Sequence, residues 1–387
     1  MIRILDYKLK IQKTDGSIHY PPVIAFQTVD SIPFENAPEA SIQVVSSNTL
    51  TDVQNVSLVE FDDIVRLQGC GRFHRNETPV FVDIFEGRVQ NIHKATVDGN
   101  TVSLECVGHL NEAFETLETF DHTWTDSDVK TILQTLMAEG HKLSRVEFSD
   151  TDIQAGVTIP ECNVTAEQMY LSDVLQESET ISGKNWFFDT RQAYSGFGVL
   201  LHSYLCWKPL PTTATQKYKV VEGSNRLISA TVDVVGEDVK TYRYVRGGTS
   251  DAGVQYHGDA SDSEAVSVYG PRYGTDTFTW VESDSLCLEI AKGLVADSKD
   301  PYISIQAVLE GTLDAHKGDL VPVDFTSLDI KGVTISGDYT AAKVQQRLNE
   351  NGEFTTTLDL GRTKLDEHEY LYKYVTKVAK TAYKNQY

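Results

Sequence analysis

Apolar and polar residues alternate along the first 111 residues, and clusters of turn-forming residues separate the alternating runs. Because successive side chains of a strand point to opposite faces of a sheet, this alternation predicts strands rather than helices. The expected strands are Arg3–Gln12, Val23–Thr28, Ala40–Val45, Ile64–Leu67, Val80–Ile92 and Val102–Val107. The edges of so long a sheet must be closed or covered, which favours a barrel or a sandwich.

After Leu110 the pattern changes to apolar residues spaced three and four apart. A capping box at Thr125–Asp128 precedes this stretch. A second helix is expected from Ser172 to Gly183, with a hairpin over 186–204 after it. The apolar stripe of the first helix is Val129, Ile132, Leu133, Leu136 and Met137.

Strands are expected again at Leu227–Val235 and Lys240–Arg246. Residues 249–280 are rich in Gly, Asp, Ser and Tyr, which predicts a long exposed loop or ribbon. A helix capped by Ser283 is expected to follow, and a last helix is expected at Asp366–Tyr387, with acids in its first turn and lysines later. The apolar stripe of the helix after Ser283 is Cys287, Ile290, Ala291 and Leu294.

One short pattern occurs twice, near the two ends of the chain. Asp-Gly and Asn-Gly supply the positive φ that a tight hairpin turn requires, so both copies predict antiparallel strands. The shared order of landmarks predicts two related β-modules. The first copy has Asp63, Gly87, the turn Asp98-Gly99 and Gly108; the second has Asp319, Gly337, the turn Asn351-Gly352 and Gly361.

The expected fold is mainly β with α+β insertions. A first β-barrel covers residues 1–111, and an α+β region is inserted at 112–222. A second barrel is divided between 223–248 and 302–362, and a long loop and a helix are inserted at 249–301. A C-terminal helix is expected over 363–387.

The chain of 387 residues carries a formal charge of -22, which changes the range of partners. Stable nucleic-acid binding requires clusters of Lys and Arg that displace counterions from phosphates, so this charge argues against it. An acidic surface suits a channel that DNA passes without sticking. Ordinary solubility explains the same charge equally well.

The five cysteines are widely spaced and include no CxxC pair. An odd number without such a pair predicts free thiols in a protein made in a reducing compartment. The start Met1–Asp6 has no apolar segment of the kind that a secretory signal contains.

Known catalytic and ligand motifs have little support. Gly69-Cys70-Gly71 begins like a dinucleotide fingerprint but lacks its third glycine and the following helix, so a loop between strands is favoured. Asp259, Asp262 and Glu264 have neither the spacing nor the glycine of an EF-hand, which favours a solvated acidic loop. The histidines form no zinc motif. We therefore expect no catalytic residue, no cofactor and no metal.

The C-terminal helix offers a candidate interface with a partner protein. Its lysines lie away from one apolar face, as expected for an amphipathic helix. Such a helix either docks on its own domain or is covered by a partner. The face consists of Leu371, Tyr374, Val375 and Val378.

The order of motifs resembles the tail hub, or baseplate hub, proteins of tailed viruses of bacteria or archaea and of related contractile injection systems. Each motif alone is common, but their order extends over most of the chain. The segments are Asp63–Leu67 followed by 79–89, Ser172–Leu175 with Gly183–Asp189, Thr241–Gly248, and Glu289–Leu294 followed by Gly318–Val323 and the Asn351-Gly352 turn.

The resemblance implies two tail-tube-like β-barrels with smaller domains inserted, and assembly as a homotrimer. Three chains with two barrels each offer six similar positions, so the ring adapts a sixfold tail tube to a threefold tip and forms part of the DNA-ejection channel. The implied partners are the neighbouring tail tube or distal tail ring, a tip, spike or fibre protein, and the tape measure protein. The implied location is the virion tail tip or baseplate, after synthesis in the host cytoplasm.

Two other functions stay open from sequence. One is a tail-associated glycan hydrolase, since an acid pair cannot be recognised among 56 carboxylates. The other is a receptor-binding or glycan-binding tail protein, for which the relevant aromatic residues are Tyr256, Tyr269, Tyr273, Phe278 and Trp280.

Overall fold

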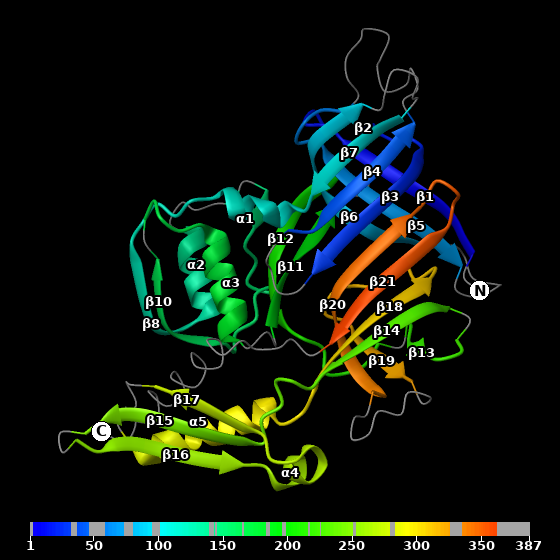
Figure 1. Ribbon diagram of the computed structural model, residues 1–387. Helices are drawn as coiled ribbons and strands as arrows, with labels where there is room; N and C mark the ends of the chain where they lie inside the picture. The colour runs from blue at the N-terminus through cyan, green and yellow to red at the C-terminus, as the bar shows by residue number, and fades with distance from the viewer. Residues whose placement is uncertain are drawn as a thin grey trace. The chain divides into compact units, whose positions relative to one another are not determined.

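A computed structural model describes most of the chain (Figure 1). The described residues divide into two compact units, one within 1–231, 306–323 and 338–361 and the other within 232–305 and 324–337. The structure describes residues 3–31, 37–45, 59–72, 80–94, 101–138, 143, 145–164, 166–182, 186–195, 199–215, 217–224, 226–250, 253–278, 283–325 and 335–361.

The chain is mainly β, as the alternation predicted. Six strands near the N-terminus form what we call the N-terminal β-module, with the spatial order β3-β4-β7-β6-β5-β1 and a short extension, β2 (Ile18–His19). All neighbours in it are antiparallel. The strands are β1 (Arg3–Gln12), β3 (Val23–Ser31), β4 (Glu39–Val45), β5 (Ile64–Arg72), β6 (Val80–Lys94) and β7 (Thr101–Val107).

The sheet of the N-terminal β-module rolls around one apolar core. Its first and last strands approach each other, because the rings of Tyr7 on β1 and Phe26 on β3 meet edge to face at 5.3 Å. Alternate residues of every strand point inward, as the two-residue period requires. The fully buried members include Leu9, Ile11, Ile42, Val44, Val65, Leu67, Val89 and Leu104.

A second set of six strands, the C-terminal β-module, repeats this arrangement. Its spatial order is β14-β18-β21-β20-β19-β13. If the six strands of each module are numbered along the chain, both modules have the same spatial order, second-third-sixth-fifth-fourth-first. The strands are β13 (Val220–Val221), β14 (Leu227–Val235), β18 (Tyr302–Glu310), β19 (Leu320–Asp324), β20 (Gly337–Leu348) and β21 (Phe354–Gly361).

The two aspartates of the repeated pattern close the same turn. Oδ2 of Asp63 accepts the N–H of Glu60 at 2.7 Å, and Oδ2 of Asp319 accepts the N–H of His316 at 3.0 Å. In each module the carbonyl of the aspartate then accepts a backbone N–H, from Val89 at 3.0 Å or Ala341 at 2.8 Å. A carboxylate that satisfies a turn N–H fixes the entry of the strand that follows, which explains why the pattern begins with Asp.

These hydrogen bonds show that Gly87 and Gly337, which the sequence pattern paired, are not at equivalent positions. Because Val89 corresponds to Ala341, Gly87 corresponds to Tyr339 and not to Gly337. A β-bulge follows Val89 and Ala341 alike, between β6 and β7 and between β20 and β21. The repeat is therefore a repeat of strand pairing, and only part of its residue pattern is shared.

Neither module closes as a separate hydrogen-bonded barrel in the pairings of the described strands. Those pairings make one 13-stranded sheet, in which β20 pairs with β3 and so joins the two modules edge to edge. The hairpin at Asn351-Gly352 is present, with Gly352 at a φ of 80°. The Asp98-Gly99 turn lies outside the described residues.

Along the chain, an α+β region with its own core follows the N-terminal module and precedes the C-terminal one. A two-stranded sheet of β8 (His122–Asp128) and β10 (Thr158–Val164) accompanies α2 (Val129–Ala138) and α3 (Leu171–Ile181). The predicted stripe on α2 is buried. The remaining elements are η1 (His109–Asn111), α1 (Glu112–Glu115), β9 (Val146–Glu147), β11 (Trp186–Tyr194) and β12 (Leu200–Pro209).

The predicted capping box was wrong. Thr125 lies within β8, paired with Glu161, so it does not begin a helix. Asp128 does this instead, since its Oδ1 accepts the N–H of Lys130 at 2.9 Å. The aspartate that closed the motif is therefore the capping residue of α2.

Residues 249–280, expected to be a long exposed loop or ribbon, form two strands and a helix over their described part. β16 (Gln255–Ser261) and β17 (Tyr273–Thr277) pair on the two sides of β15 (Tyr242–Thr249), and α4 (Ser263–Tyr269) lies between them in the chain. The helix α5 (Asp284–Ser298) covers one face of this sheet, and its predicted stripe is buried there. Position 258 requires glycine, because a Cβ there would lie 2.2 Å from the backbone nitrogen of Leu288 on α5.

Along the described ranges, no helix is both long and apolar enough to cross a membrane. The predicted C-terminal helix lies outside those ranges.

Candidate functional site: the joint between the two β-modules

The two β-modules meet where the second half of β20 pairs with β3. The pairing is antiparallel and runs from Lys343 opposite Ser31 to Leu348 opposite Phe26. The first half of β20 pairs with β19 of its own module, so β20 changes partner along its length. A strand that pairs in two modules fixes their relative register, because each pair exchanges backbone hydrogen bonds.

An aromatic cluster fills the apolar side of this joint. The ring of Phe26 lies 6.0 Å from that of Phe354 on β21, and Tyr7 lies 6.1 Å from Phe354. Leu348 and Leu313 are buried in the same core. Residues of the C-terminal module therefore complete the core of the N-terminal one, and neither is independent of the other.

Buried polar groups on the same joint are satisfied by the segment before β19. Gln346 on β20 donates to the carbonyls of Thr312 at 3.2 Å and Leu313 at 2.9 Å. Thr356 on β21 donates to the carbonyl of Thr312 at 2.7 Å. Because an unpaired carbonyl in the interior costs about 1–3 kcal/mol, these bonds hold the segment 312–313 in place.

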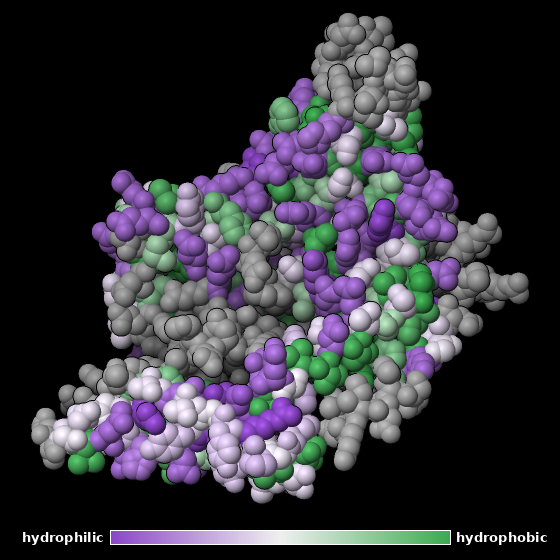
Figure 2. All heavy atoms as spheres, viewed as in Figure 1, coloured by the Kyte–Doolittle hydropathy of each residue, from purple (hydrophilic) through white to green (hydrophobic). Residues whose placement is uncertain are grey.

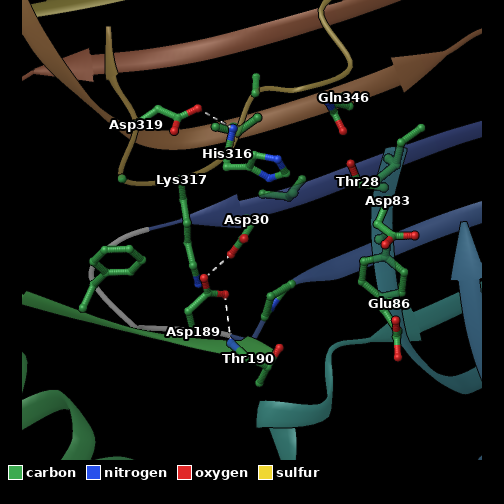
Figure 3. A pocket seen from close by; sticks show the side chains of 18 of the residues that line it. Thr28, Asp30, Asp83, Glu86, Asp189, Thr190, His316, Lys317, Asp319 and Gln346 are labelled. Carbon is green, nitrogen blue, oxygen red and sulfur yellow. Dashed lines mark hydrogen bonds and ion pairs between the residues drawn. The ribbon is translucent and has the colours of Figure 1, made fainter. Parts of the chain in front are cut away.

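A cluster of charged residues lies beside the joint, in a cavity of about 560 Å³ (Figure 3). Lys317, which precedes β19, places its Nζ 2.9 Å from Oδ1 of Asp30 on β3. Asp189 on β11 lies next to this pair and binds Lys208 at 2.8 Å. The cluster thus links both β-modules to the α+β region.

The electrostatics of the cluster favour a protonated Lys317. Burial opposes its charge, but Asp30 and Asp189 outweigh burial and raise the pKa of Lys317. Burial of Asp30 raises the pKa of that carboxyl despite Lys317. Burial acts in the same direction on Asp189, yet Lys317 and Lys208 together lower its pKa. The ammonium of Lys317 is therefore the centre of the cluster.

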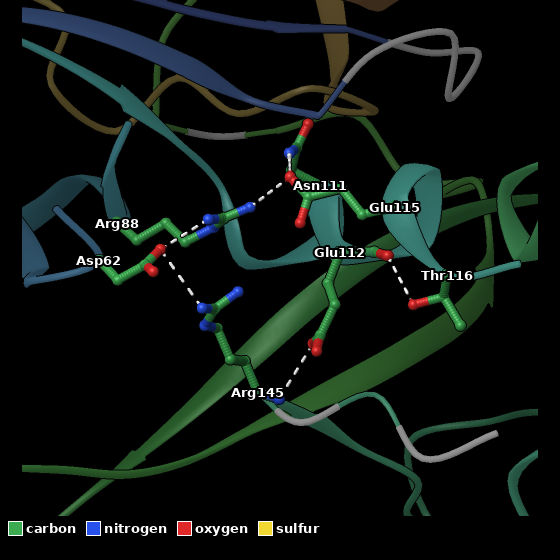
Figure 4. Close-up of polar contacts among 7 residues, drawn as sticks. All are labelled: Asp62, Arg88, Asn111, Glu112, Glu115, Thr116 and Arg145. Atoms are coloured by element: carbon green, nitrogen blue, oxygen red, sulfur yellow. Dashed lines mark hydrogen bonds and ion pairs between the residues drawn. The ribbon is translucent and has the colours of Figure 1, made fainter. Parts of the chain in front are cut away.

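A second charged cluster attaches the α+β region to β6 (Figure 4). Arg88, whose side chain is 8% exposed, binds Asp62 at 2.7 Å and Glu115 of α1 at 2.6 Å. Arg145 also contacts Asp62, at 3.3 Å, and its N–H donates to Glu112 at 2.9 Å. A guanidinium satisfied by two carboxylates at once holds their two segments at a fixed spacing.

These clusters have the chemistry of a structural joint. Their carboxylates are bound to Lys or Arg, and no group of three or more His, Cys, Asp or Glu side chains in the described ranges is arranged to hold a metal ion. Asp262 of the acidic segment caps α4 by accepting the N–H of Ala265 at 2.9 Å and binds Lys299 at 3.0 Å.

Most of the other residues singled out from the sequence lie in strands or pack in the core. Gly69 lies in β5, where a Cβ would meet Leu313 at 2.6 Å, so the glycine makes room for that leucine. Tyr256 and Phe278 pack against the core under α5, whereas Tyr273 is 71% exposed. The interface candidates on the C-terminal helix, Leu371, Tyr374, Val375 and Val378, lie outside the described residues, as does Trp280.

Sequence reasoning did not identify Asp30, Asp189 and Lys317 as a site. They are far apart in the chain, and no motif joined the three. Asp189 ends the segment Gly183–Asp189 that carried the resemblance, and Asp319 of the repeated pattern lies two residues after Lys317.

No protein-family model and no curated protein sequence matches the chain significantly. Solved structures do. The prophage MuSo2 43 kDa tail protein from Shewanella oneidensis aligns with a TM-score of 0.58 at 11% identity, over 94% of this chain and 98% of that one. The prophage tail protein gp18 from Listeria monocytogenes aligns with a TM-score of 0.54 at 12% identity, over 96% and 99%.

A chain of a Francisella PdpA-VgrG complex is similar as well, with a TM-score of 0.54 at 9% identity, over 94% of this chain and 59% of that one. At such identities the likeness concerns the fold. The resemblance stated from the order of motifs is confirmed to that extent, because the matches run the length of the chain. This chain has, over nearly its full length, the fold of phage tail proteins.

Proposed function

We propose that the protein is a structural tail hub, a ring of three chains that adapts a sixfold tail tube to a threefold tip. The observation that carries this proposal is the repeat of one six-stranded module within a single chain. Three chains then present six modules of the same topology, and a closed ring of them abuts a sixfold tube without symmetry mismatch. In this proposal each module acts as a tail-tube-like barrel.

The joint supports the proposal because it fixes two modules side by side. Aromatic packing, satisfied backbone groups and the Lys317 cluster all lie at that one place. The charge of -22 suits a ring whose channel DNA crosses without binding. The neighbours in the assembly would be a tube or distal tail ring on one side and a tip, spike or fibre protein on the other.

The proposed role involves no catalytic step and is carried out in the virion tail. The similar proteins from Shewanella oneidensis and Listeria monocytogenes are named as tail proteins, which supports this placement. The division into two barrels and two insertions remains part of the proposal, with β13 counted in the second barrel and β15 in the second insertion because of the strands that they pair with.

The mass of the protein in solution tests the ring. We expect particles of three times the 43.1 kDa chain mass, in a proportion that rises with ionic strength. The charges of -22 on each chain repel at low salt, and ions screen that repulsion within about 10 Å at 0.1 M. Light scattering at several protein and salt concentrations measures the mass. A stable dimer contradicts the proposal, since two chains cannot supply six modules.

Removal of Asp366–Tyr387 tests the C-terminal helix as a contact with a partner protein. We expect the truncated chain to fold with unchanged strand content by circular dichroism, because the last of the described strands, β21, ends at Gly361. We expect its incorporation into tails to fall at least tenfold in a complementation assay. Normal incorporation contradicts the partner role, and aggregation of the truncated chain indicates that the helix covers its own core.

A further inference from the structure

The strand β14 is a long apolar edge without a second neighbour among the described strands. It pairs with β18 on one side and ends the sheet on the other. Six of its nine residues are Leu, Ile, Val or Ala, and Ile228 is 57% exposed. Figure 2 shows hydrophobic side chains gathered over β14 and β18. Proteins rarely leave such an edge open, because it recruits another strand.

Its counterpart in the N-terminal module, β3, has the neighbour that β14 lacks. The edge of β3 is covered by the second half of β20, and Phe26 and Thr28 are buried there. The two strands correspond residue by residue at their starts. The carbonyl of Pro22 accepts the N–H of Val45 at 3.1 Å, and that of Arg226 accepts the N–H of Glu310 at 2.8 Å. Both strands then run for nine residues.

The strand that would cover β14 also has a counterpart, β6. One edge of β6 corresponds to the edge of β20 that binds β3. Along this edge β6 pairs with β5 only as far as Arg88, and Val89 exchanges backbone hydrogen bonds with the turn at Asp62 and Asp63. From Asn91 onward this side has no partner strand in the described ranges. Ile92 there is half-buried, whereas Val344 at the corresponding place of β20 is buried.

We propose that β14 of one chain pairs antiparallel with Asn91–Lys94 of β6 in a second copy of this chain. The contact repeats, between chains, the joint that β3 and β20 make within a chain. It rests on the proposed ring, in which three joints within chains then alternate with three between chains. Both otherwise open edges are satisfied by one type of contact.

The internal joint fixes the register of the external one. Since Val89 corresponds to Ala341, His93 corresponds to Gln345, which pairs with Val29 on β3. The equal lengths of β3 and β14 place Asp233 at the position of Val29. His93 of one chain therefore faces Asp233 of the next, and both are exposed in the single chain. An imidazole opposite a carboxylate is a favourable cross-strand pair.

A disulfide between these positions tests the contact. Residues opposite each other on antiparallel strands lie about 4.5–5.5 Å apart at Cα, within the range that a disulfide spans. The variant carrying His93→Cys and Asp233→Cys is expected to form covalent trimers under mild oxidation, seen on a non-reducing gel. The five native cysteines are buried, and burial raises the pKa of Cys106 to about 12. We therefore expect few disulfides that involve the native cysteines.

Three controls accompany this variant. Each single variant alone is expected to form no covalent multimers, whereas an equal mixture of the two is expected to form dimers. The pair Val29→Cys and Gln345→Cys, at the known register, is expected to form a disulfide within one chain without an increase in mass. The pair His93→Cys and Val232→Cys is one residue out of register and is expected to cross-link at least tenfold less.

Light scattering of the same samples separates the outcomes. Particles of trimer mass without a disulfide overturn the β14–β6 contact and leave the ring standing. Monomers at every concentration, without a disulfide, overturn both. Covalent ladders longer than three chains support the contact and overturn threefold closure.

Discussion

Replacing Lys317 with methionine is expected to lower the free energy of unfolding by about 3 kcal/mol. Loss of one partner from a buried ion pair costs about 3–5 kcal/mol, because the other charge stays in the interior unpaired. The side chain of Lys317 is only 5% exposed, but that of Asp30 is 34% exposed, so the lower end applies. Denaturant unfolding followed by tryptophan fluorescence measures the change, since Trp186 and Trp207 lie in the same unit.

Two further variants show whether charge is the cause. Lys343→Met removes an exposed lysine of β20 and is expected to change stability by less than about 0.5 kcal/mol. Adding Asp30→Asn to Lys317→Met removes the orphaned carboxylate and is expected to recover part of the loss. Equal destabilisation by the single and the double variant contradicts the ion-pair account and points to lost packing of the lysine stem.

The effect of Lys317→Met has a defined pH range. The pKa of Lys317 is raised in the folded chain, so its contribution is complete below the unfolded value of 10.5 and is lost as pH rises through the folded value. The pKa of Asp189 is lowered, so its contribution is present above 3.8 and is lost as pH falls through the folded value. Asp30 acts in the opposite sense, because burial raises the pKa of its carboxyl and Lys317→Met removes the cation that opposes this rise. The loss of stability caused by Lys317→Met is therefore expected to shrink as pH falls and Asp30 becomes protonated.

The strands of the N-terminal module were predictable because each has one buried face. The sequence placed β1 at Arg3–Gln12, as observed, and β4 and β7 within one residue. In the same way, the stripe on α2 was found from its period. Burial on one side of an element leaves a periodic pattern that needs no knowledge of the rest of the fold.

The small sheet of β15, β16 and β17 was missed because it carries little of this pattern. Only Gly258 is buried on β16, and none of the described side chains of β17 is. Glycine there permits close contact with α5, yet in a sequence it indicates a turn. The composition of residues 249–280 therefore favoured a loop where tertiary packing forms strands.

The charged site was beyond sequence reasoning for a different reason. Asp30, Asp189 and Lys317 meet only because β20 pairs with β3 and β11 lies beside them. Nothing local distinguishes them among the 56 carboxylates and 34 basic residues of the chain. The repeated pattern was detectable because Asp63 and Asp319 perform the same local task in two turns.

The repeat also shows where the two modules differ. Position 87 of the first module is glycine, and the corresponding position of the second is Tyr339. At Gly87 a Cβ would lie 2.1 Å from the carbonyl oxygen of Val107 and 2.7 Å from its carbon. Those are backbone atoms at the end of β7, and they cannot rotate away as a side chain does. The close approach belongs to the N-terminal module alone.

Gly87→Ala is therefore expected to destabilise the chain by about 3 kcal/mol or more. Overpacking of an interior costs about 1–3 kcal/mol when side chains adjust, and here β6 and β7 must separate instead. A glycine replaced by alanine ordinarily gains about 0.4–1 kcal/mol through the unfolded state, so a loss indicates the clash itself. Arg88, one residue on, would move away from Asp62 and Glu115 as the strands part.

Gly236→Ala is the matched control for Gly87→Ala, because its nearest neighbour, Nη1 of Arg272, lies 4.0 Å from the added Cβ. We expect that control to change stability by less than about 1 kcal/mol in chemical denaturation. If Gly87→Ala behaves like the control, β7 tolerates the methyl group, and the glycine of the repeated pattern has no steric role. If Gly87→Ala unfolds at lower denaturant concentration and Gly236→Ala does not, the tight contact between β6 and β7 explains why position 87 is glycine.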